Sequence, residues 1–423
     1  MGASVILSVS IFVIAYIIIV SEKINRTVVA LLGALLMILF HIISQEAALE
    51  SIDFNTIGLL IGMMIIVNVI KRTGLFQYLA ILMAKLAKGN PMKIMLYFSI
   101  ITAVSSGLLD NVTTILLIVP VSLVISDSLK INPIPFVIAE IMSANIGGAA
   151  TLIGDPPNIM IGSFTGLGFL DFIINLAPLM IMIFIVNIIL IKFIYRKSLK
   201  VNAEERDVLM NLDPSKTITD KKLLIQSLII LFITITGFTI AEFIGLESAS
   251  ISLFGATALL LVCRIDPDEV LMDVEWGTIF FFGGLFVLVG SLESVGVISM
   301  LAEKLLNVTQ GDIGFTTILI LWSSAILSSV LDNIPYVATM IPLVNEMESI
   351  SVGDYLPVWW ALSIGACLGG NGTIIGASAN VVARGIVERH QKSFSFITYM
   401  KIAFPLMILS IVISTVYLVV FYL

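Results

Sequence analysis

The sequence predicts an all-α polytopic membrane protein whose two halves form an inverted-topology repeat. Of its 423 residues, 59% are apolar and 12% are charged, whereas soluble globular domains are usually about 45–50% apolar and about 25% charged. Several apolar runs approach the roughly 20 residues that a helix needs to cross the hydrocarbon core. The sequence also aligns with itself, without a gap, after a shift of 222 residues.

The composition excludes several other classes of protein. The formal net charge is −7, so no basic surface for nucleic acid is expected. The two cysteines and two histidines supply neither a disulfide framework nor a zinc site. No nucleophile–His–acid set and no nucleotide-binding loop is found, so we expect no enzymatic activity, no cofactor and no ATP-binding domain in this chain.

Uninterrupted and interrupted apolar segments together predict about ten spanning helices. Eight runs are uninterrupted: 4–20, 27–44, 56–70, 170–195, 222–244, 248–263, 277–291 and 398–422. The first lacks a basic n-region and a cleavage site, so it is expected to be retained. Regions 133–165 and 357–389 are broken by Gly and Pro residues and predict two broken helices. Regions 94–126 and 315–346 each carry a central Asp-Asn pair and predict two re-entrant hairpins.

The distribution of Lys and Arg predicts the orientation of the chain in the cell membrane. Basic residues follow the runs 4–20, 56–70 and 170–195, while the acidic stretches 46–53 and 346–354 fall on the opposite side. This places the N-terminus and the C-terminus outside and residues 197–221 in the cytoplasm. The assignment requires each Asp-Asn hairpin to enter and leave on the same side.

The internal repeat is the strongest sign of a secondary transporter. Asp110-Asn111 aligns with Asp332-Asn333, and six of twelve residues are identical between 147–158 and 369–380. The expected domains are N-terminal scaffold spans (1–50), a first transporter repeat (51–196), a cytoplasmic linker (197–221), connecting scaffold spans (222–274) and a second transporter repeat (275–423).

Three acids inside apolar regions are candidates for ion binding. A charge at the bilayer centre costs at least ~2.5–3.5 kcal/mol on insertion scales, so Asp110, Asp155 and Asp332 are expected to face a cavity or a partner. Hard cations prefer carboxylate and carbonyl oxygens, so the Asp-Asn pairs predict sodium or proton sites at Asp110, Asn111, Asp332 and Asn333. The simpler interpretation, that these Asp residues cap helices, is compatible with that role.

The Gly- and Pro-rich breaks add further candidates. An unwound backbone exposes carbonyl groups, and Asn158 is expected to cap the half-helix that follows Pro156-Pro157. Asp155 is replaced by Ala377 in the second half, so we expect Asp155 to contribute to pH dependence and Ser378 to influence substrate preference. An alternative is that Asp155 only caps the half-helix. The full set of expected ion- or substrate-binding residues is Asp110, Asn111, Thr113, Gly148, Thr151, Asp155, Asn158, Asp332, Asn333, Gly370, Asn371, Thr373, Ser378 and Asn380.

The same motifs resemble a known group of transporters. The segments Leu109–Thr114, Asn145–Asn158, Leu331–Pro335 and Gly369–Val382 are similar to signatures of the ion transporter superfamily. The likeness is to the branch that contains arsenite permeases, D-type sodium/proton antiporters and the P protein, with a citrate transporter-like domain. This resemblance implies a homodimer in which a transport domain moves against a scaffold like an elevator.

We therefore expect an ion-coupled secondary active transporter for an inorganic ion or small metalloid solute, with Na⁺ or H⁺ as the coupling or exchanged ion. Its partners would be this solute, the lipid bilayer and a second copy of the chain. One alternative is a sodium- or proton-coupled di- or tricarboxylate symporter, which two built-in acids disfavour by like-charge repulsion. Another is a passive anion channel on the same fold.

Overall fold

The first half of the chain forms a regular series of helices. The computed structural model describes residues 2–21, 23–196, 199, 201, 210 and 213–423, so most of the predicted linker 197–221 lies outside the described residues. The helices of the first half are α1 (Ala3–Ser21), α2 (Arg26–Leu39), α3 (Gln45–Glu50), α4 (Phe54–Arg72), α5 (Leu75–Leu86), α6 (Pro91–Leu108), α7 (Asn111–Ser128), α8 (Ile134–Gly148), α9 (Pro156–Thr165) and α10 (Phe169–Tyr195).

The second half repeats this series almost residue for residue. After the 3-10 turn η1 (Pro214–Thr217), its helices are α12 (Lys221–Ile244), α13 (Ser248–Cys263), α14 (Pro267–Leu271), α15 (Trp276–Ser294), α16 (Val297–Thr309), α17 (Ile313–Val330), α18 (Asn333–Ile350), α19 (Leu356–Gly369), α20 (Ser378–Arg389) and α21 (Phe396–Phe421). Each of α13–α20 begins 222 residues after its counterpart among α2–α9. The correspondence therefore reaches upstream to Arg26 and Ser248, beyond the motifs that reveal it in the sequence.

The predicted breaks and turns are present, and local sequence explains them. α8 ends at Gly148 and α9 begins at Pro156, while α19 ends at Gly369 and α20 begins at Ser378. Pro lacks a backbone N–H and is tolerated in a first helical turn, where that N–H would have no partner. The confirmed architecture is thus all-helical within the described residues, with two broken helices and two Asp-Asn hairpins, α6–α7 and α17–α18.

Nine helices in the described part of the chain are long and apolar enough to cross a membrane. They are α1, α4, α6, α7, α10, α12, α15, α17 and α21. This agrees with the predicted number of about ten, but the members differ, because α2 and α13 have only 14 and 16 residues. The hairpin helices α6, α7 and α17, of 18 residues each, are long enough to count as spanning helices instead. At 1.5 Å per residue each of them is about 27 Å long. The re-entrant course of the hairpins stays a prediction.

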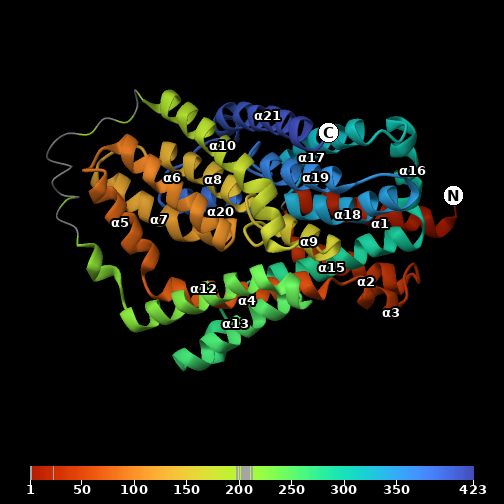
Figure 1. The fold of residues 1–423 in the computed structure, drawn as a ribbon, viewed down its shortest axis with the longest axis horizontal. Helices are drawn as coiled ribbons and strands as arrows, with labels where there is room; N and C mark the ends of the chain where they lie inside the picture. Colours follow the sequence, from red (N-terminus) through yellow and green to blue (C-terminus); the bar gives the residue numbers. More distant parts are fainter. Residues whose placement is uncertain (1, 22, 197–198, 200, 202–209, 211–212) are drawn as a thin grey trace.

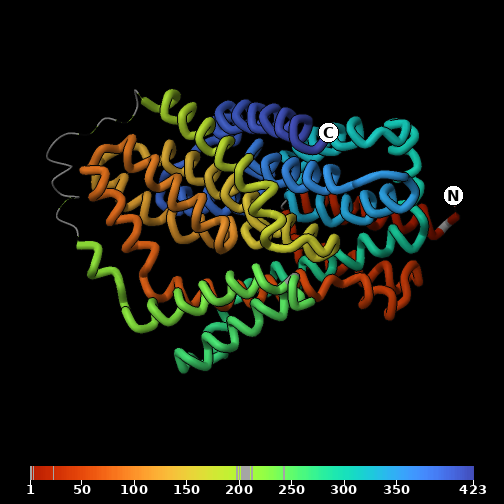
Figure 2. The backbone as a smooth tube through the Cα atoms, in the orientation of Figure 1, coloured from red at the N-terminus to blue at the C-terminus, as the bar shows by residue number. Residues whose placement is uncertain are grey.

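The helices form two groups that lie side by side (Figure 1 and Figure 2). α2, α4, α12, α13 and α15 run along the lower edge of the view, and the hairpins, broken helices, α10 and α21 lie above them. α5 and α16 stand at opposite ends of the molecule. In the lower group each repeat packs on the other: Gly62 of α4 lies against Ser252 of α13, and its counterpart Gly284 of α15 lies against Ala30 of α2. Such small residues let helices approach closely.

The broken helices form the centre of the upper group. Every residue of α8 is buried, as are all but the first of α19, and a helix that is apolar all round belongs in a protein core. α8 packs closely on α6 where Gly147 meets Ala103, and α19 packs on α17 where Gly369 meets Ala325. The outer surfaces of other helices are strongly apolar, with Phe243 79% exposed, as lipid contact requires.

Contacts join loops that are distant in the sequence. Lys392 Nζ, after α20, lies 2.5 Å from Asp127 Oδ1 near the end of α7. The Thr219 backbone N–H, just before α12, donates to the Thr73 carbonyl at the end of α4 with N···O 3.1 Å. The first pair joins the segment after α20 to the end of α7, and the second joins the segment before α12 to the end of α4. The side of the membrane on which these segments lie stays a prediction.

Candidate functional site

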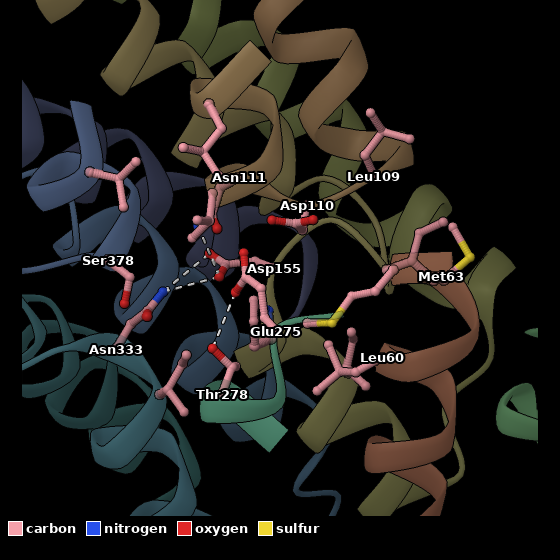
Figure 3. A pocket seen from close by; sticks show the side chains of 18 of the residues that line it. Leu60, Met63, Leu109, Asp110, Asn111, Asp155, Glu275, Thr278, Asn333 and Ser378 are labelled. Carbon is pink, nitrogen blue, oxygen red and sulfur yellow. Dashed lines mark hydrogen bonds between the residues drawn. The ribbon is translucent and has the colours of Figure 1, made fainter. Parts of the chain in front are cut away.

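A cavity of about 190 Å³ lies where the two groups of helices meet, and we call it the central cavity (Figure 3). Its apolar walls come from α4, α7 and α9, including Leu60, Met63 and Ile159. Its polar lining comes from both repeats and consists of Arg26, Asp110, Asn111, Asp155, Glu275, Thr278, Asn333 and Ser378. An apolar pocket with a few converging polar groups is the usual form of a small-ligand site.

Asp155 is the buried acid at which both hairpins meet. Its side chain is 0% exposed. Asn111 Nδ2 of the first hairpin donates to its Oδ1 at 3.2 Å, and Asn333 Nδ2 of the second hairpin lies 3.2 Å from each of its oxygens. Asp155 precedes α9, but its side chain makes no capping hydrogen bond there. The alternative interpretation of Asp155 as a helix cap is therefore wrong, because its carboxylate joins the two halves of the protein.

The other two acids cap their hairpin helices, as predicted. Asp110 Oδ1 accepts from the Thr113 backbone N–H at 2.7 Å, and Asp332 Oδ1 accepts from the Ile334 backbone N–H at 3.1 Å. Their remaining contacts differ. Asp332 Oδ2 is 2.9 Å from the guanidinium of Arg26, whereas Asp110 lines the central cavity without an ion pair among the described residues.

A chain of buried amides connects the first hairpin with the second break. Asn111 Nδ2 lies 3.4 Å from Asn145 Oδ1 on α8. Asn145 Nδ2 in turn donates to Asn371 Oδ1 and to Asn380 Oδ1, both at 3.0 Å. Buried polar groups need such partners, since a lost hydrogen bond in a low dielectric is costly. Asn145 begins the motif Asn145–Asn158 but is not among the predicted site residues, although its hydrogen bonds join the two halves of the protein.

Many of the predicted site residues support the breaks instead of lining the central cavity. Thr151 Oγ1 donates to the Gly107 carbonyl at 2.6 Å, and the equivalent Thr373 Oγ1 donates to the Ser329 carbonyl at 2.5 Å. Both hydroxyls are thus used to fasten the break to the adjacent hairpin. Thr113 contributes its backbone N–H to Asp110.

The remaining predicted residues close the broken segments on themselves. Asn158 lies inside α9, so the expected cap is wrong; its Nδ2 donates to the Thr151 carbonyl at 2.9 Å. Asn380 Nδ2 donates to the carbonyls of Gly370 and Thr373 at 2.7 and 2.8 Å. Gly148 has no room for a Cβ, which would lie 2.6 Å from the Gly154 carbonyl oxygen. Of the predicted set, Asp110, Asn111, Asp155, Asn333 and Ser378 line the central cavity.

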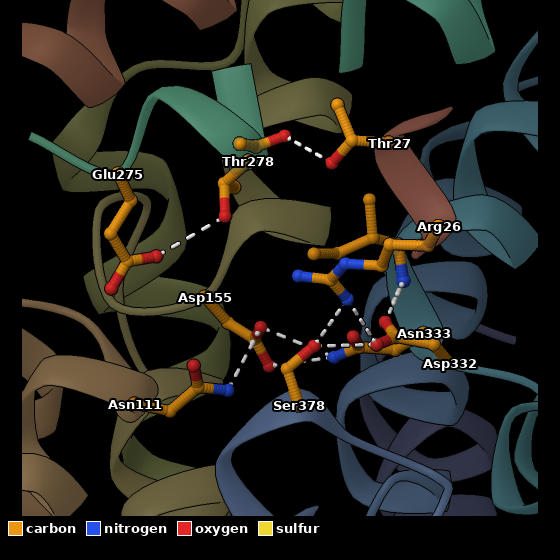
Figure 4. Close-up of polar contacts among 11 residues, drawn as sticks. Arg26, Thr27, Asn111, Asp155, Glu275, Thr278, Asp332, Asn333 and Ser378 are labelled. Carbon is orange, nitrogen blue, oxygen red and sulfur yellow. Dashed lines mark hydrogen bonds and ion pairs between the residues drawn. The ribbon is translucent and has the colours of Figure 1, made fainter. Parts of the chain in front are cut away.

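Three polar residues of the central cavity are absent from the predicted set (Figure 4). Arg26 begins α2, and in the sequence it reads only as a basic loop residue. Glu275 precedes α15, and Thr278 Oγ1 donates to its Oε2 at 3.2 Å. A sequence signal for Glu275 exists, because it aligns with Asp53, the acid that caps α4. No local pattern marks Arg26, whose partner lies 306 residues away.

A second cavity, of about 330 Å³, is the repeat-related counterpart of the first, and we call it the paired cavity. Residues at equivalent positions line the two cavities. The pairs, central cavity first, are Glu275 and Asp53, Met64 and Phe286, Leu116 and Ala338, and Val382 and Met160. Only the central cavity reaches Asp155 and the hairpin Asn residues. The two cavities therefore have equivalent residues in their walls, but of the two, the central cavity contacts Asp155 and the hairpin Asn residues.

The acids surround the central cavity without forming a metal-binding cluster. Within the described ranges, no group of three or more Asp, Glu, His or Cys side chains converges on one position suited to a metal ion. Asn111 and Asn333 both direct Nδ2 toward Asp155, and no described residue donates a hydrogen bond to their amide oxygens. Both residues line the central cavity.

These features define a class of protein. A polytopic helical protein with an inverted repeat, two broken helices and buried acids where the repeats meet is a membrane transporter.

Comparison with known proteins identifies the family. Residues 16–365 match the family described as Citrate transporter, CitMHS, and the chain belongs to this family. It is 42% identical over 419 residues to an uncharacterised transporter of Mycobacterium tuberculosis, covering 98% of this chain and 97% of that protein. It is 32% identical over 502 residues to the P protein of Mus musculus, covering 99% of this chain and 60% of that protein.

A solved structure shares the fold. The crystal structure of the Alcanivorax borkumensis YdaH transporter matches with a TM-score of 0.58 at 14% identity, over 99% of this chain and 98% of that one. The likeness extends over both repeats, so the two chains share the overall fold.

Proposed function

We propose that this protein is an ion-coupled secondary active transporter that binds Na⁺ or H⁺ in the central cavity. The transported solute would be an inorganic ion or a small metalloid species. The observation that carries the proposal is the position of Asp155, which is fully buried and hydrogen-bonded by the tips of both hairpins. An intramembrane acid shared by two repeats is typical of an ion or proton pathway.

The charges around the central cavity support a cationic ligand. Asp110, Asp155 and Glu275 line it, and none of them belongs to an ion pair in the described part of the chain. The single basic side chain of the lining, Arg26, is paired with Asp332. Three carboxyls in a low dielectric repel one another, so binding of a cation or a proton relieves that repulsion.

The paired cavity supports alternating access. Because the repeats are equivalent, exchanging their conformations would separate the central cavity from Asp155 and the hairpin Asn residues and connect the paired cavity to them. Asp53 would then take the position that Glu275 now holds. We propose that the hairpins and broken helices move as an elevator against α2, α4, α13 and α15. A homodimer, implied by the family resemblance, is part of this proposal.

A second candidate is a cation-coupled di- or tricarboxylate symporter, which the description of the family favours. A guanidinium at the cavity wall would suit a carboxylate substrate, whereas the three acids disfavour it. A passive anion channel is the third candidate. Flux into proteoliposomes of arsenite, chloride, citrate, Na⁺ and H⁺, each with and without imposed Na⁺ or pH gradients, separates them. Saturable flux that responds to a gradient supports a transporter; unsaturable flux without coupling supports a channel.

Replacing Asp110 with Asn should remove or redirect the ion dependence of transport. The substitution keeps the shape and the ability to cap α7 but removes a charge from the central cavity. Flux against cation concentration in proteoliposomes is the measurement. Asp127→Asn is the matched control, since Asp127 forms a partly exposed ion pair at the end of the same helix, and such pairs contribute about 0–1 kcal/mol. Unchanged coupling in Asp110→Asn would reduce this acid to a cap.

We also propose that the protein lies in the plasma membrane with residues 197–221 in the cytoplasm and both termini outside. A cysteine at Lys216 should then react with an impermeant thiol reagent only from the cytoplasmic face, and a cysteine at Val352 only from outside. Both positions are exposed. Cys263 is partly accessible and should first be replaced, while Cys367 is buried. Labelling of both positions from the same face would contradict the inverted topology.

A further inference from the structure

The second Asp-Asn pair is occupied by a cation of the protein itself. Arg26 Nη1 lies 2.9 Å from Asp332 Oδ2 and donates to Ser378 Oγ at 2.7 Å. Ser378 Oγ also donates to Asp332 Oδ2 at 2.5 Å, so the three groups form a closed triangle (Figure 4). The guanidinium therefore stands where a cation bound to Asp332 would stand.

Packing holds the guanidinium in that position. Arg26 Cζ lies 4.9 Å from the centre of the Phe281 ring on α15, a contact that favours a partly desolvated cation. The side chains of Arg26 and Asp332 are 31% and 16% exposed. Arg26 and Ser378 line the central cavity on one side and a cavity of about 350 Å³ on the other. The ion pair thus separates two spaces that a small ion could enter.

Among the described residues, no cation pairs with the first Asp-Asn pair in this way. The counterpart of Arg26 in the other repeat is Ser248, and the counterpart of Ser378 is Pro156. Neither can supply a positive charge or a hydroxyl-bridged guanidinium to Asp110. The two repeats thus have equivalent backbones but different charges. Asp110 of the first pair faces the central cavity, and the charge of Asp332 in the second pair is neutralised by Arg26.

We propose that Arg26 is a specificity-determining residue that fills the second Asp-Asn site as a built-in cation and confines exchangeable cations to the first. This inference rests on the proposed cation binding at Asp110, which it deepens by assigning different roles to the two repeats. Removal of Arg26 with Asp332 left in place should convert the second pair into an additional cation site. Removal of both charges should abolish that additional site.

Melting of the purified full-length protein in detergent tests the proposal. NaCl is titrated against choline chloride at matched ionic strength and mildly alkaline pH, for the wild type, Arg26→Gln and Arg26→Gln/Asp332→Asn. A ligand that binds only the folded state raises the melting temperature with its concentration. Arg26→Gln should gain a Na⁺-dependent rise on the order of a few degrees beyond the wild type, and the double variant should lose that gain.

The matched control is Arg72→Gln. The Arg72 side chain has a similar exposure of 34% and pairs with Glu269 and Asp273. It lines neither the central cavity nor the cavity of about 350 Å³. It should gain no response to Na⁺. A gain in Arg72→Gln equal to that of Arg26→Gln would show a general effect of lost positive charge and would overturn the proposal.

The outcomes are separable from those of the proposed function. Superimposable Na⁺ curves for the wild type and Arg26→Gln, or an additional response that persists in the double variant, would refute the role of Arg26. Absence of coupled flux in the wild type would instead refute the proposed transport. If Arg26→Gln does not fold, Arg26→Lys replaces it: an ammonium lacks the planar fork that reaches both Asp332 and Ser378, so Na⁺ should compete with it, and a flat response would count against the proposal.

Discussion

Replacing Asp155 with Asn should lower the affinity of the transporter for its coupling cation by at least about tenfold. The Asp155 carboxylate lines the central cavity, and two opposite unit charges about 4 Å apart attract by about 4 kcal/mol at an effective dielectric constant of about 20. Loss of a third of that attraction already corresponds to about tenfold in affinity. An amide at this position would also place one N–H group against the Asn111 and Asn333 donors. The variant should further lose the pH dependence of transport in the range where the wild type shows it.

Initial rates of flux in proteoliposomes, measured against cation concentration and against pH at matched protein content, test this prediction. Asp171→Asn is the control: Asp171 lies in the first turn of α10, and its Oδ2 accepts from the Gly168 backbone N–H at 2.8 Å. Its loss should alter neither curve. Superimposable pH profiles for the wild type and Asp155→Asn would exclude a proton-handling role for Asp155.

Replacing Gly147 with Ala should destabilise the protein by about 1–3 kcal/mol or more, the range expected for overpacking a filled core. A Cβ at this position would lie 2.1 Å from the carbonyl oxygen of Ala103 on α6. That contact is with backbone, so α6 and α8 would have to move apart, and the hairpin tip that carries Asn111 would move with them. The melting temperature of the purified variant is the measurement.

Gly283→Ala is the control of opposite expected sign. Gly283 lies within α15, and its Cβ would meet nothing within 4 Å, while Ala is favoured over Gly inside a helix by about 1 kcal/mol. This variant should be as stable as the wild type or more stable. Equal melting temperatures for Gly147→Ala and Gly283→Ala would show that the α6–α8 contact is not tightly packed.

Repeat symmetry extends the test to the second half of the chain. Gly369 is the counterpart of Gly147, and its Cβ would lie 2.6 Å from the carbonyl oxygen of Ala325 on α17. Gly369→Ala should therefore also destabilise the protein, by less than Gly147→Ala.

Short-range signals in the sequence predicted the two Asp-Asn turns and the two breaks in the helices. Asp110 and Asp332 cap the second helix of each hairpin, and Pro156 opens α9. Such signals act within about four residues, because a cap or a Pro acts on backbone groups in the same helical turn. The 222-residue repeat then placed these signals twice, which is why the repeated series of helices could be predicted before any packing was known.

The tertiary structure alone decided which polar groups meet. Asp155 accepts from Asn333, 178 residues away, and Arg26 pairs with Asp332, 306 residues away. No periodicity or spacing predicts such partners, since they depend on how whole helices pack. The same packing brings Thr151 and Thr373 next to hairpin carbonyls, to which their hydroxyls donate because buried polar groups need hydrogen-bond partners. It also leaves Asp110 at the wall of the central cavity.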